Sequence, residues 1–418
     1  MHTSFYRSAF LCFLALGARS VFGAEAVPPL TLDAAVQLAL ATSPELRAAD
    51  GRIAAALGRA DQSRRWANPE LTLNADDWPT GRGGFSEAKK LVGLSQAVPF
   101  PGKKRLDRQL GVADVRTAEA EVAQHRLELI REVKGAFFQV LAARQRVAVA
   151  AELTAVATAS ADTARKRVAA GAAPDQELLR AEIALELARN EAASLAREAD
   201  SARQTLATLL GRAELADTAI AGALADTVDL SILDRTPARD AAHPSLAIAR
   251  SARDRAELAL RRARLEPYPD VTMAVAGGRD GASGTSVVQL GLSVPLPLFD
   301  RSKGRKQEAT AQVAIADAEL TTATRKLARD WQLAAQRLRT AAAQVASYRE
   351  RILPKADAAQ RLVQIGFEQG KFGLVDLLDT QRTAAEARLA YQQKLLELHL
   401  AHADVEALLA PAGDPKSS

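Results

Sequence analysis

Two histidines and two aspartates are the residues whose spacing comes nearest to a chemical site. His399 and His402 stand three positions apart in a helical pattern, so both rings can face one side of a helix and hold a metal ion. No third ligand accompanies them, and we interpret them as an ordinary pair on a helix surface, with no metal site and no cofactor. Asp376 and Asp379 have the same spacing, which places two carboxylates on one helical face.

The groups needed for catalysis are otherwise missing from the sequence. The only cysteine, Cys12, lies in a segment that we expect to be removed, so the mature chain has no disulfide, thiolate metal site or thiol nucleophile. No serine, histidine or glycine-rich loop forms a recognisable catalytic motif. The sequence therefore does not predict an enzyme.

The composition favours long helices. Hydrophobic residues make up 48% of the 418 positions but aromatic residues only 4%, so alanine, leucine and valine dominate. Such chains pack helices closely through small side chains. The formal net charge of +5 is modest for this length, and we expect no nucleic-acid partner.

The first 23 residues are typical of a secretory signal peptide. Arg7 precedes the apolar run from Ala9 to Ala18, and small residues precede Ala24. No later run approaches the length of a membrane-spanning helix. We therefore expect an exported protein whose mature chain begins near residue 24.

The mature chain is an internal duplication. Four landmarks return in the same order about 200 positions later, which is the signature of a repeat. They are Ser43–Leu46 with His243–Leu246, Asn68–Leu73 with Tyr268–Met273, Gly93–Ser95 with Gly291–Ser293, and Gly171 with Gly370. We assign the first repeat to residues 24–220 and the second to 221–411, and predict a disordered tail at 412–418.

Each repeat has the same predicted order of elements. Helices start near Leu32 and near Asp240, and each pattern is interrupted at a proline. Alternating apolar residues then predict a β-hairpin at about 69–99 and again at about 269–297. A helical pattern follows without a break to a turn near 171, and in the second repeat to a turn near 370. About 65 residues at 1.5 Å each would make a helix about 100 Å long, which implies coiled-coil packing.

Four strands of about ten residues can cross an outer membrane but cannot close a barrel. An open sheet in lipid would leave backbone groups unpaired, so several chains must contribute strands. Three chains give twelve strands, enough to surround a pore. Aromatic residues near the strand ends favour this placement: Trp66, Phe100, Tyr268 and Phe299 at the inner ends, with Trp78 and Phe85 toward the outer turns.

The sequence resembles the TolC family of outer-membrane efflux ducts. The resemblance rests on the repeat, on Gly93–Lys104, and on the segments Phe367–Gly370 and Val375–Arg382. It implies a mainly α fold with a membrane β-barrel portion, in which a homotrimer closes a 12-stranded barrel in outer-membrane lipid. Long antiparallel helices would continue this barrel across the periplasm as an α-barrel. The implied partners are a periplasmic adaptor and an inner-membrane pump of the resistance-nodulation-division type.

The resemblance also implies a closed periplasmic entrance. Asp376 and Asp379 match the family's ring of carboxylates, and Glu177 is its counterpart in the first repeat. The helical turns would contact the adaptor through Gly171, Ala172, Gly370 and Lys371. Phe367 and Phe372 depart from the family's best-known member, so its closed-state hydrogen bonds do not carry over. The alternative is that both aspartates are acids favoured at a helix N-terminus.

We therefore predict a passive exit duct of a tripartite efflux system in the outer membrane. The passage Val98–Lys103 looks most like the branch partnered with heavy-metal cation pumps. The duct of a protein-secretion system is the alternative within the same fold. A periplasmic coiled-coil adaptor is the alternative from another class, but two separate strand pairs disfavour it.

Overall fold

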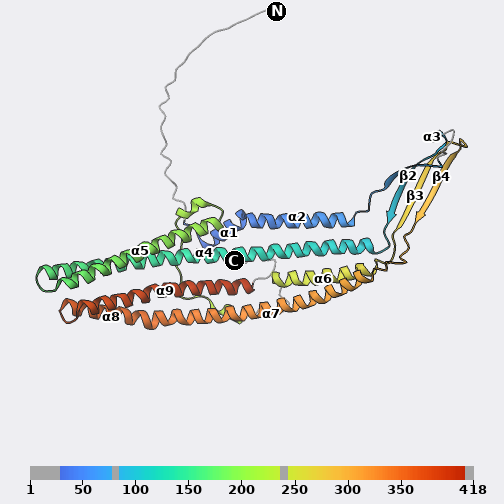
Figure 1. The fold of residues 1–418 in the computed structure, drawn as a ribbon. Coiled ribbons are helices and arrows are strands. Elements are labelled where there is room, and N and C mark those ends of the chain that lie inside the picture. Colours follow the sequence, from blue (N-terminus) through green and yellow to red (C-terminus); the bar gives the residue numbers. More distant parts are fainter. Residues whose placement is uncertain (1–28, 78–83, 236–242, 410–418) are drawn as a thin grey trace, which may run out of the picture.

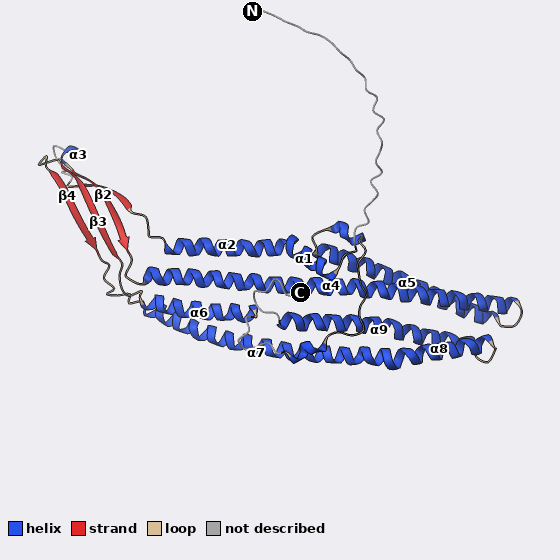
Figure 2. Ribbon diagram, turned by 180° about the vertical axis from the view of Figure 1, so that it is seen from behind, coloured by secondary structure: helices blue, strands red, loops and turns tan. Residues whose placement is uncertain are grey.

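The protein is a long helical bundle with a small sheet at one end (Figure 1). The computed structural model describes residues 29–77, 84–235 and 243–409. The predicted signal peptide, Trp78 and the predicted tail lie outside these ranges. Both helical turns lie at the end of the bundle far from the sheet, as the opposite view also shows (Figure 2). The two ends of the molecule therefore have different structures.

The first half of the chain contains three shorter helices, two strands and a long helical hairpin. The helices α1 (Leu32–Thr42) and α2 (Pro44–Arg64) precede β1 (Glu70–Asp76), the one-turn helix α3 (Gly84–Glu87) and β2 (Lys89–Val98). The hairpin consists of α4 (Lys103–Ala169) and α5 (Asp175–Leu209), and the 3₁₀ turns η1 (Ala213–Asp217) and η2 (Leu230–Asp234) follow. Ser43 separates α1 from α2 because its side chain caps α2 and Pro44 occupies the first position of that helix.

The second half repeats the order of helix, two strands and long helical hairpin, but its described residues include no counterpart of α1 or α3. The elements are α6 (Pro244–Arg264), β3 (Val271–Asp280), β4 (Ser286–Ser293), α7 (Lys303–Ser347), the π-helical turn η3 (Tyr348–Ile352), α8 (Leu353–Glu368) and α9 (Leu374–Leu409). The expected helix start near Asp240 lies outside the described residues. The repeat boundary at residue 220 remains a prediction.

One expectation about the second long helix was wrong. The helix from Lys303 to Glu368 is not regular, because a π-helical turn interrupts it at Tyr348–Ile352. The N–H of Leu353 bonds to the Tyr348 carbonyl, five residues back. Pro354 follows directly, and its ring cannot donate to the backbone and crowds the preceding turn. The wider turn accommodates the proline without ending the helix.

The four strands form one antiparallel sheet in the order β1-β2-β3-β4. Large apolar side chains share one face: Leu71, Leu73, Val92, Leu94, Met273, Val275, Val288, Leu290 and Leu292. Between about half and five sixths of each side chain is exposed. The other face carries mostly small or polar residues, and Thr72, Gly93, Ala276 and Gln289 form one cross-strand row of it. Leu91 and Val287 are large apolar residues on this face. Such an apolar face on an exposed sheet requires a nonaqueous environment or a partner.

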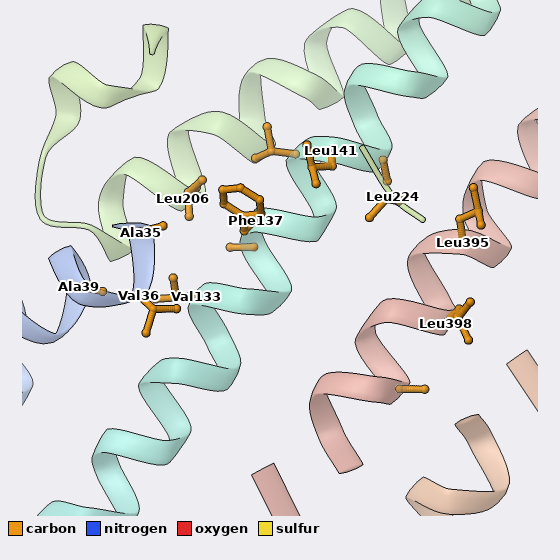
Figure 3. Close-up of a cluster of buried hydrophobic side chains, with 14 of the residues drawn as sticks. Ala35, Val36, Ala39, Val133, Phe137, Leu141, Leu206, Leu224, Leu395 and Leu398 are labelled. Carbon is orange, nitrogen blue, oxygen red and sulfur yellow. The ribbon is translucent and has the colours of Figure 1, made fainter. Parts of the chain in front are cut away.

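The main core lies in the middle of the bundle, where the two halves meet. Val133 and Phe137 of α4 are nearly inaccessible to solvent. They pack against α1 and α5, while leucines of α9 approach the other side of the same cluster (Figure 3). Ala35 and Ala39 on α1 are fully buried, so small side chains let α1 lie close to α4. This core holds the two long helical hairpins side by side.

A buried histidine, His243, caps the start of α6. The backbone N–H of Ser245 donates to His243 Nδ1 at 3.3 Å, so the ring serves as the helix N-cap. Burial of the imidazole lowers the pKa of His243, and a hydrogen bond to the Ala407 backbone only partly opposes this. The native protein therefore holds His243 as a neutral ring.

This neutral cap predicts a loss of stability in acid. The pKa of His243 is lower in the native state, so the unfolded chain takes up the proton first as the pH falls through about 6.5. The contribution of the neutral ring is complete above that pH and declines below it. We expect His243→Asn, which keeps a capping oxygen, to weaken the dependence of the thermal unfolding midpoint on pH between 8 and 5. An unchanged dependence in this variant would contradict the assignment.

Candidate functional site

The two helical turns have the same backbone structure. Gly171 has a φ of +69° and Gly370 a φ of +73°. In the first turn the N–H of Ala172 bonds to the Arg167 carbonyl, and in the second the N–H of Lys371 bonds to the Gly366 carbonyl. These are Schellman motifs, which need a left-handed residue and favour glycine there. Ala172 and Lys371 are exposed at the two tips.

A phenylalanine closes the second turn against the end of α8. A Cβ atom on Gly366 would lie 2.1 Å from Phe372 Cδ2, so the ring occupies the space that any larger residue would need. Phe372 is nonetheless 45% exposed. The second tip therefore presents an aromatic edge to the solvent.

The two tips are held together by a small separate core. Phe367 of α8 and Leu377 of α9 are buried against alanines of α4 and α5. The guanidinium of Arg167 lies over the Phe367 ring at 4.9 Å from its centroid. This contact joins the end of α4 to the end of α8, so the tips are expected to move as a unit.

Glu177 has a partner that the sequence did not reveal. Its Oε2 lies 4.0 Å from Nη1 of Arg167, and its side chain is 26% exposed. The same Oε2 accepts no hydrogen bond within the described residues. The nearby cation partly balances the charge of Glu177, because Arg167 folds back from the end of α4.

Asp376 and Asp379 lie near the start of α9 and are both exposed. Asp376 Oδ2 accepts a hydrogen bond from the backbone N–H of Gly373 at 3.1 Å. Asp376 is the third residue of α9, and its bond to the N–H of the N-cap residue is one of the two bonds of a capping box. Neither carboxylate forms an ion pair in the described part of the single chain, so both remain available to other charges.

A groove runs beside these carboxylates between α5 and α9. It has a volume of about 760 Å³, and Asp379 and Arg382 lie along one wall. The apolar side chains of Ile183 and Leu187 line the other wall and are 60% and 65% exposed. Exposed apolar surface of this kind usually marks contact with another protein.

A buried polar pair at the groove, whose lining includes Gln381, joins the two hairpins to each other. Gln381 Nε2 on α9 donates to Ser160 Oγ on α4 at 3.0 Å. Both residues are among the few buried polar ones in the described chain. A buried amide keeps its place only where its partners are satisfied, so this pair sets the register between α4 and α9.

The predicted interface aromatics divide into two kinds. Phe100 and Tyr268 stack with ring centroids 4.7 Å apart at the base of the sheet. Trp66 and Phe299 are 57% and 100% exposed at the same end. Among the outer-turn residues, Phe85 lies beneath the Lys90 ammonium. Their depth in a membrane remains a prediction.

The histidine pair has other partners. His399 Nε2 lies 2.9 Å from the Ala225 carbonyl, and its ring packs on Phe138. His402 Nδ1 lies 3.6 Å from a carboxylate oxygen of Glu406. Within the described residues, no three histidines, cysteines or carboxylates come together as metal ligands. The His399 ring therefore holds the segment after η1 against α9, whereas His402 pairs within its own helix.

No helix in the described ranges combines the length and the apolar character needed to cross a bilayer.

A family model described as outer membrane efflux protein matches residues 35–212 and 240–410. The chain is 30% identical to the cobalt-zinc-cadmium resistance protein CzcC of Cupriavidus metallidurans, over 93% of this chain and 92% of that protein. It is 27% identical to the nickel-cobalt-cadmium resistance protein NccC of Alcaligenes xylosoxydans, over 75% and 70% of the two chains. The outer membrane protein VceC from Vibrio cholerae has a similar fold, with a TM-score of 0.77, 18% identity, and 91% and 96% coverage.

Proposed function

Since the chain belongs to the outer membrane efflux protein family, we propose that it is the exit duct for heavy-metal cations in a tripartite efflux system. Three copies would close one β-barrel and one continuous helical tunnel. The duct is passive: a pump in the inner membrane supplies the energy, and an adaptor in the periplasm joins the pump to the duct.

The sheet carries this proposal. Its two edge strands, β1 and β4, are each paired on one side only. One of its faces carries mostly large apolar side chains, and the other carries mostly small or polar ones. A sheet of this kind is stable in lipid when further copies pair with its edges, so that the apolar face meets lipid and the polar face lines water. Trp66, Phe100, Tyr268 and Phe299 would then lie at the inner boundary of the membrane.

The substrate class rests on the relatives. CzcC and NccC are described as resistance proteins for cobalt, zinc, nickel and cadmium. We extend this class to the present chain, with a pump of the resistance-nodulation-division type as its partner. A passive duct needs no metal-binding site of its own, because the cations only have to diffuse through its lumen.

Deleting the gene in cells that retain the pump and the adaptor tests the proposal. We expect tolerance to cobalt, zinc and cadmium to fall and to return when the wild-type chain is supplied. Tolerance to an uncharged antibiotic serves as the control for general damage to the envelope. Unchanged metal tolerance in the deletion strain, with the pump present and no other duct expressed, would contradict the assignment.

We expect the two tips to meet the adaptor. Cysteines placed at Ala172 or Lys371 should form crosslinks to the adaptor in intact cells, because both side chains are exposed beside the left-handed glycines. Ala282, which is exposed in the turn between β3 and β4, provides the matched control at the other end. Neighbouring Gly281 is unsuitable, since a Cβ atom there would lie 2.2 Å from the Ser86 carbonyl oxygen. Equal crosslinking from Ala282→Cys would contradict the assignment of the tips as the adaptor contact.

A further inference from the structure

The two halves of the chain meet along a junction that contains paired charges. Lys103, the first residue of α4, is buried, and its Nζ lies 2.9 Å from Oδ1 of Asp270, which precedes β3. The same oxygen accepts the backbone N–H of Phe100 at 2.7 Å. Further along, Asp107 and Asp114 of α4 pair with Arg262 and Arg255 of α6. These three pairs lie at the end of the junction near the sheet; Arg131 and Lys134 of α4 pair with Asp404 and Glu406 of α9 nearer the middle of the bundle.

The repeat places equivalent residues elsewhere on the same chain. The helices α2 and α6 begin at Pro44 and Pro244, and α4 and α7 begin at Lys103 and Lys303, so a shift of 200 positions relates them. The residues before α4 and α7, Gly102 and Ser302, both have positive φ angles, of 96° and 54°. The two helix starts therefore have equivalent backbones.

For each of the three ion pairs near the sheet, the residues 200 positions away also form a pair of compatible chemistry. Lys103 and Asp270 correspond to Lys303 and Glu70, again a cation and an anion. Arg262 and Asp107 correspond to Gln62 and Gln307, two amides. Arg255 and Asp114 correspond to Ala55 and Ala314, two methyl groups. The main cost of burying such an interface is a charge left without a partner of opposite sign. In the second set every charge would have such a partner.

Within one chain these six residues are exposed and cannot meet. The helices form a layer in which α2 contacts α4, α4 contacts α6, and α6 contacts α7. Accordingly, α2 and α7 lie on opposite sides of the bundle (Figures 1 and 2). They are the two edges of this helical layer, just as β1 and β4 are the two edges of the sheet.

The α7 edge has a cavity that lacks an anion. It has a volume of about 370 Å³ at the start of α7, and its lining includes Arg264, Arg301, Lys303 and Lys306 but no carboxylate. In the equivalent place on α4, Asp270 balances Lys103. The α7 edge is therefore complementary to an acidic group, and Glu70 stands on the opposite edge of the chain.

We infer that the junction between the two halves of one chain is repeated between chains, so that Lys303 of one copy pairs with Glu70 of the next. The α7 edge then packs on α2 of the neighbouring copy, with Gln307 against Gln62 and Ala314 against Ala55. This inference rests on the proposed homotrimer, and it specifies which surfaces join and in which register.

Crosslinking tests the pair directly, because the sequence has no cysteine other than Cys12. Glu70→Cys combined with Lys303→Cys is treated in membranes with a short bis-maleimide, since an ion pair can hold its Cα atoms farther apart than a disulfide permits. We expect covalent dimers and trimers. The matched control, Asp270→Cys with Lys103→Cys, should link within one chain and give no covalent dimers or trimers. Glu70→Cys with Lys371→Cys, at opposite ends of the molecule, should give neither product.

Charge reversal provides a second measurement. Lys303→Glu should reduce the fraction of assembled protein that survives mild heating in detergent, because it places two anions together. The double variant Lys303→Glu with Glu70→Lys should restore most of that fraction. Failure of the double variant to recover, while each protein is made and exported normally, would overturn the pair.

The outcome separates this inference from the proposed function. If the mass of the detergent-solubilised particle shows a trimer but the cysteine pair at Glu70 and Lys303 gives no covalent oligomers, the duct proposal stands and the inferred interface is wrong. If particle mass shows a monomer, both are wrong. Covalent dimers and trimers from the Glu70–Lys303 pair, with none from the Asp270–Lys103 control, support both.

Discussion

Replacing Gly278 with valine is expected to abolish assembly of the sheet and, with it, the mature protein in the outer membrane. Gly278 lies in β3 opposite Leu91 of β2. A Cβ atom at this position would lie 1.8 Å from the Lys90 carbonyl oxygen, and backbone atoms of β2 cannot move away without breaking the pairing. The β2–β3 pairing joins the two halves of the chain, so both β-hairpins would separate.

The neighbouring glycine is the matched control. A Cβ atom on Gly277 has nothing within 4 Å, and the residue lies in the cross-strand row of Leu73, Val92 and Val288 on the apolar face. Gly277→Val should therefore assemble as the wild type does. Heat-resistant oligomer in purified outer membranes is the measurement. Equal amounts of oligomer from both variants would show that the close approach at Gly278 does not matter.

Removing the charges of Asp376 and Asp379 together is expected to abolish most of the cation preference of the reconstituted channel. In three copies these residues would bring six carboxylates to one entrance, which favours cations and attracts multivalent blockers. Asparagine is the better substitution at both positions than alanine. Asparagine removes the charge, and at position 376 its side-chain oxygen can still accept the Gly373 N–H.

Single-channel recording with multivalent cations added to each side measures this effect. The wild type should be blocked from the periplasmic side, and Asp376→Asn with Asp379→Asn should lose most of that block while it assembles normally. The control is Asp162→Asn with Asp200→Asn, two exposed carboxylates already paired with arginines on their own helices. If the aspartates only stabilise the start of α9, the double variant should conduct and be blocked as the wild type is.

The sequence predicted the elements that depend on local patterns. Alternation of apolar residues located the four strands, and the 3–4 spacing of apolar residues located the long helices. Gly171 and Gly370 marked the helical turns because a left-handed residue is needed there. The helix α3 was missed because it is a single turn inside a glycine-rich connection. The π-helical turn was missed because Pro354 can either end a helix or be accommodated by a wider turn.

The contacts that give the site its properties join residues far apart in the chain. Ser160, Gln381 and Lys103 are ordinary polar residues in helical patterns, and Asp270 is an ordinary acid before a strand. Only the packing of α4 against α9 and β3 brings each pair together. Arg167 reaches Phe367 because the two tips pack side by side, whereas it reaches nearby Glu177 because the chain reverses at the first turn. The shift of 200 positions was the one signal that could have related Lys303 to Glu70.

The central claim is that several copies of this chain enclose one continuous passage. Reconstruction of the detergent-solubilised particle by electron cryomicroscopy tests it most directly. We predict three copies around one axis, with β4 of each beside β1 of the next and a lumen that runs from the sheet to the helical tips. A particle with a single chain whose sheet closes on itself, or an assembly of copies without a shared lumen, would contradict the account.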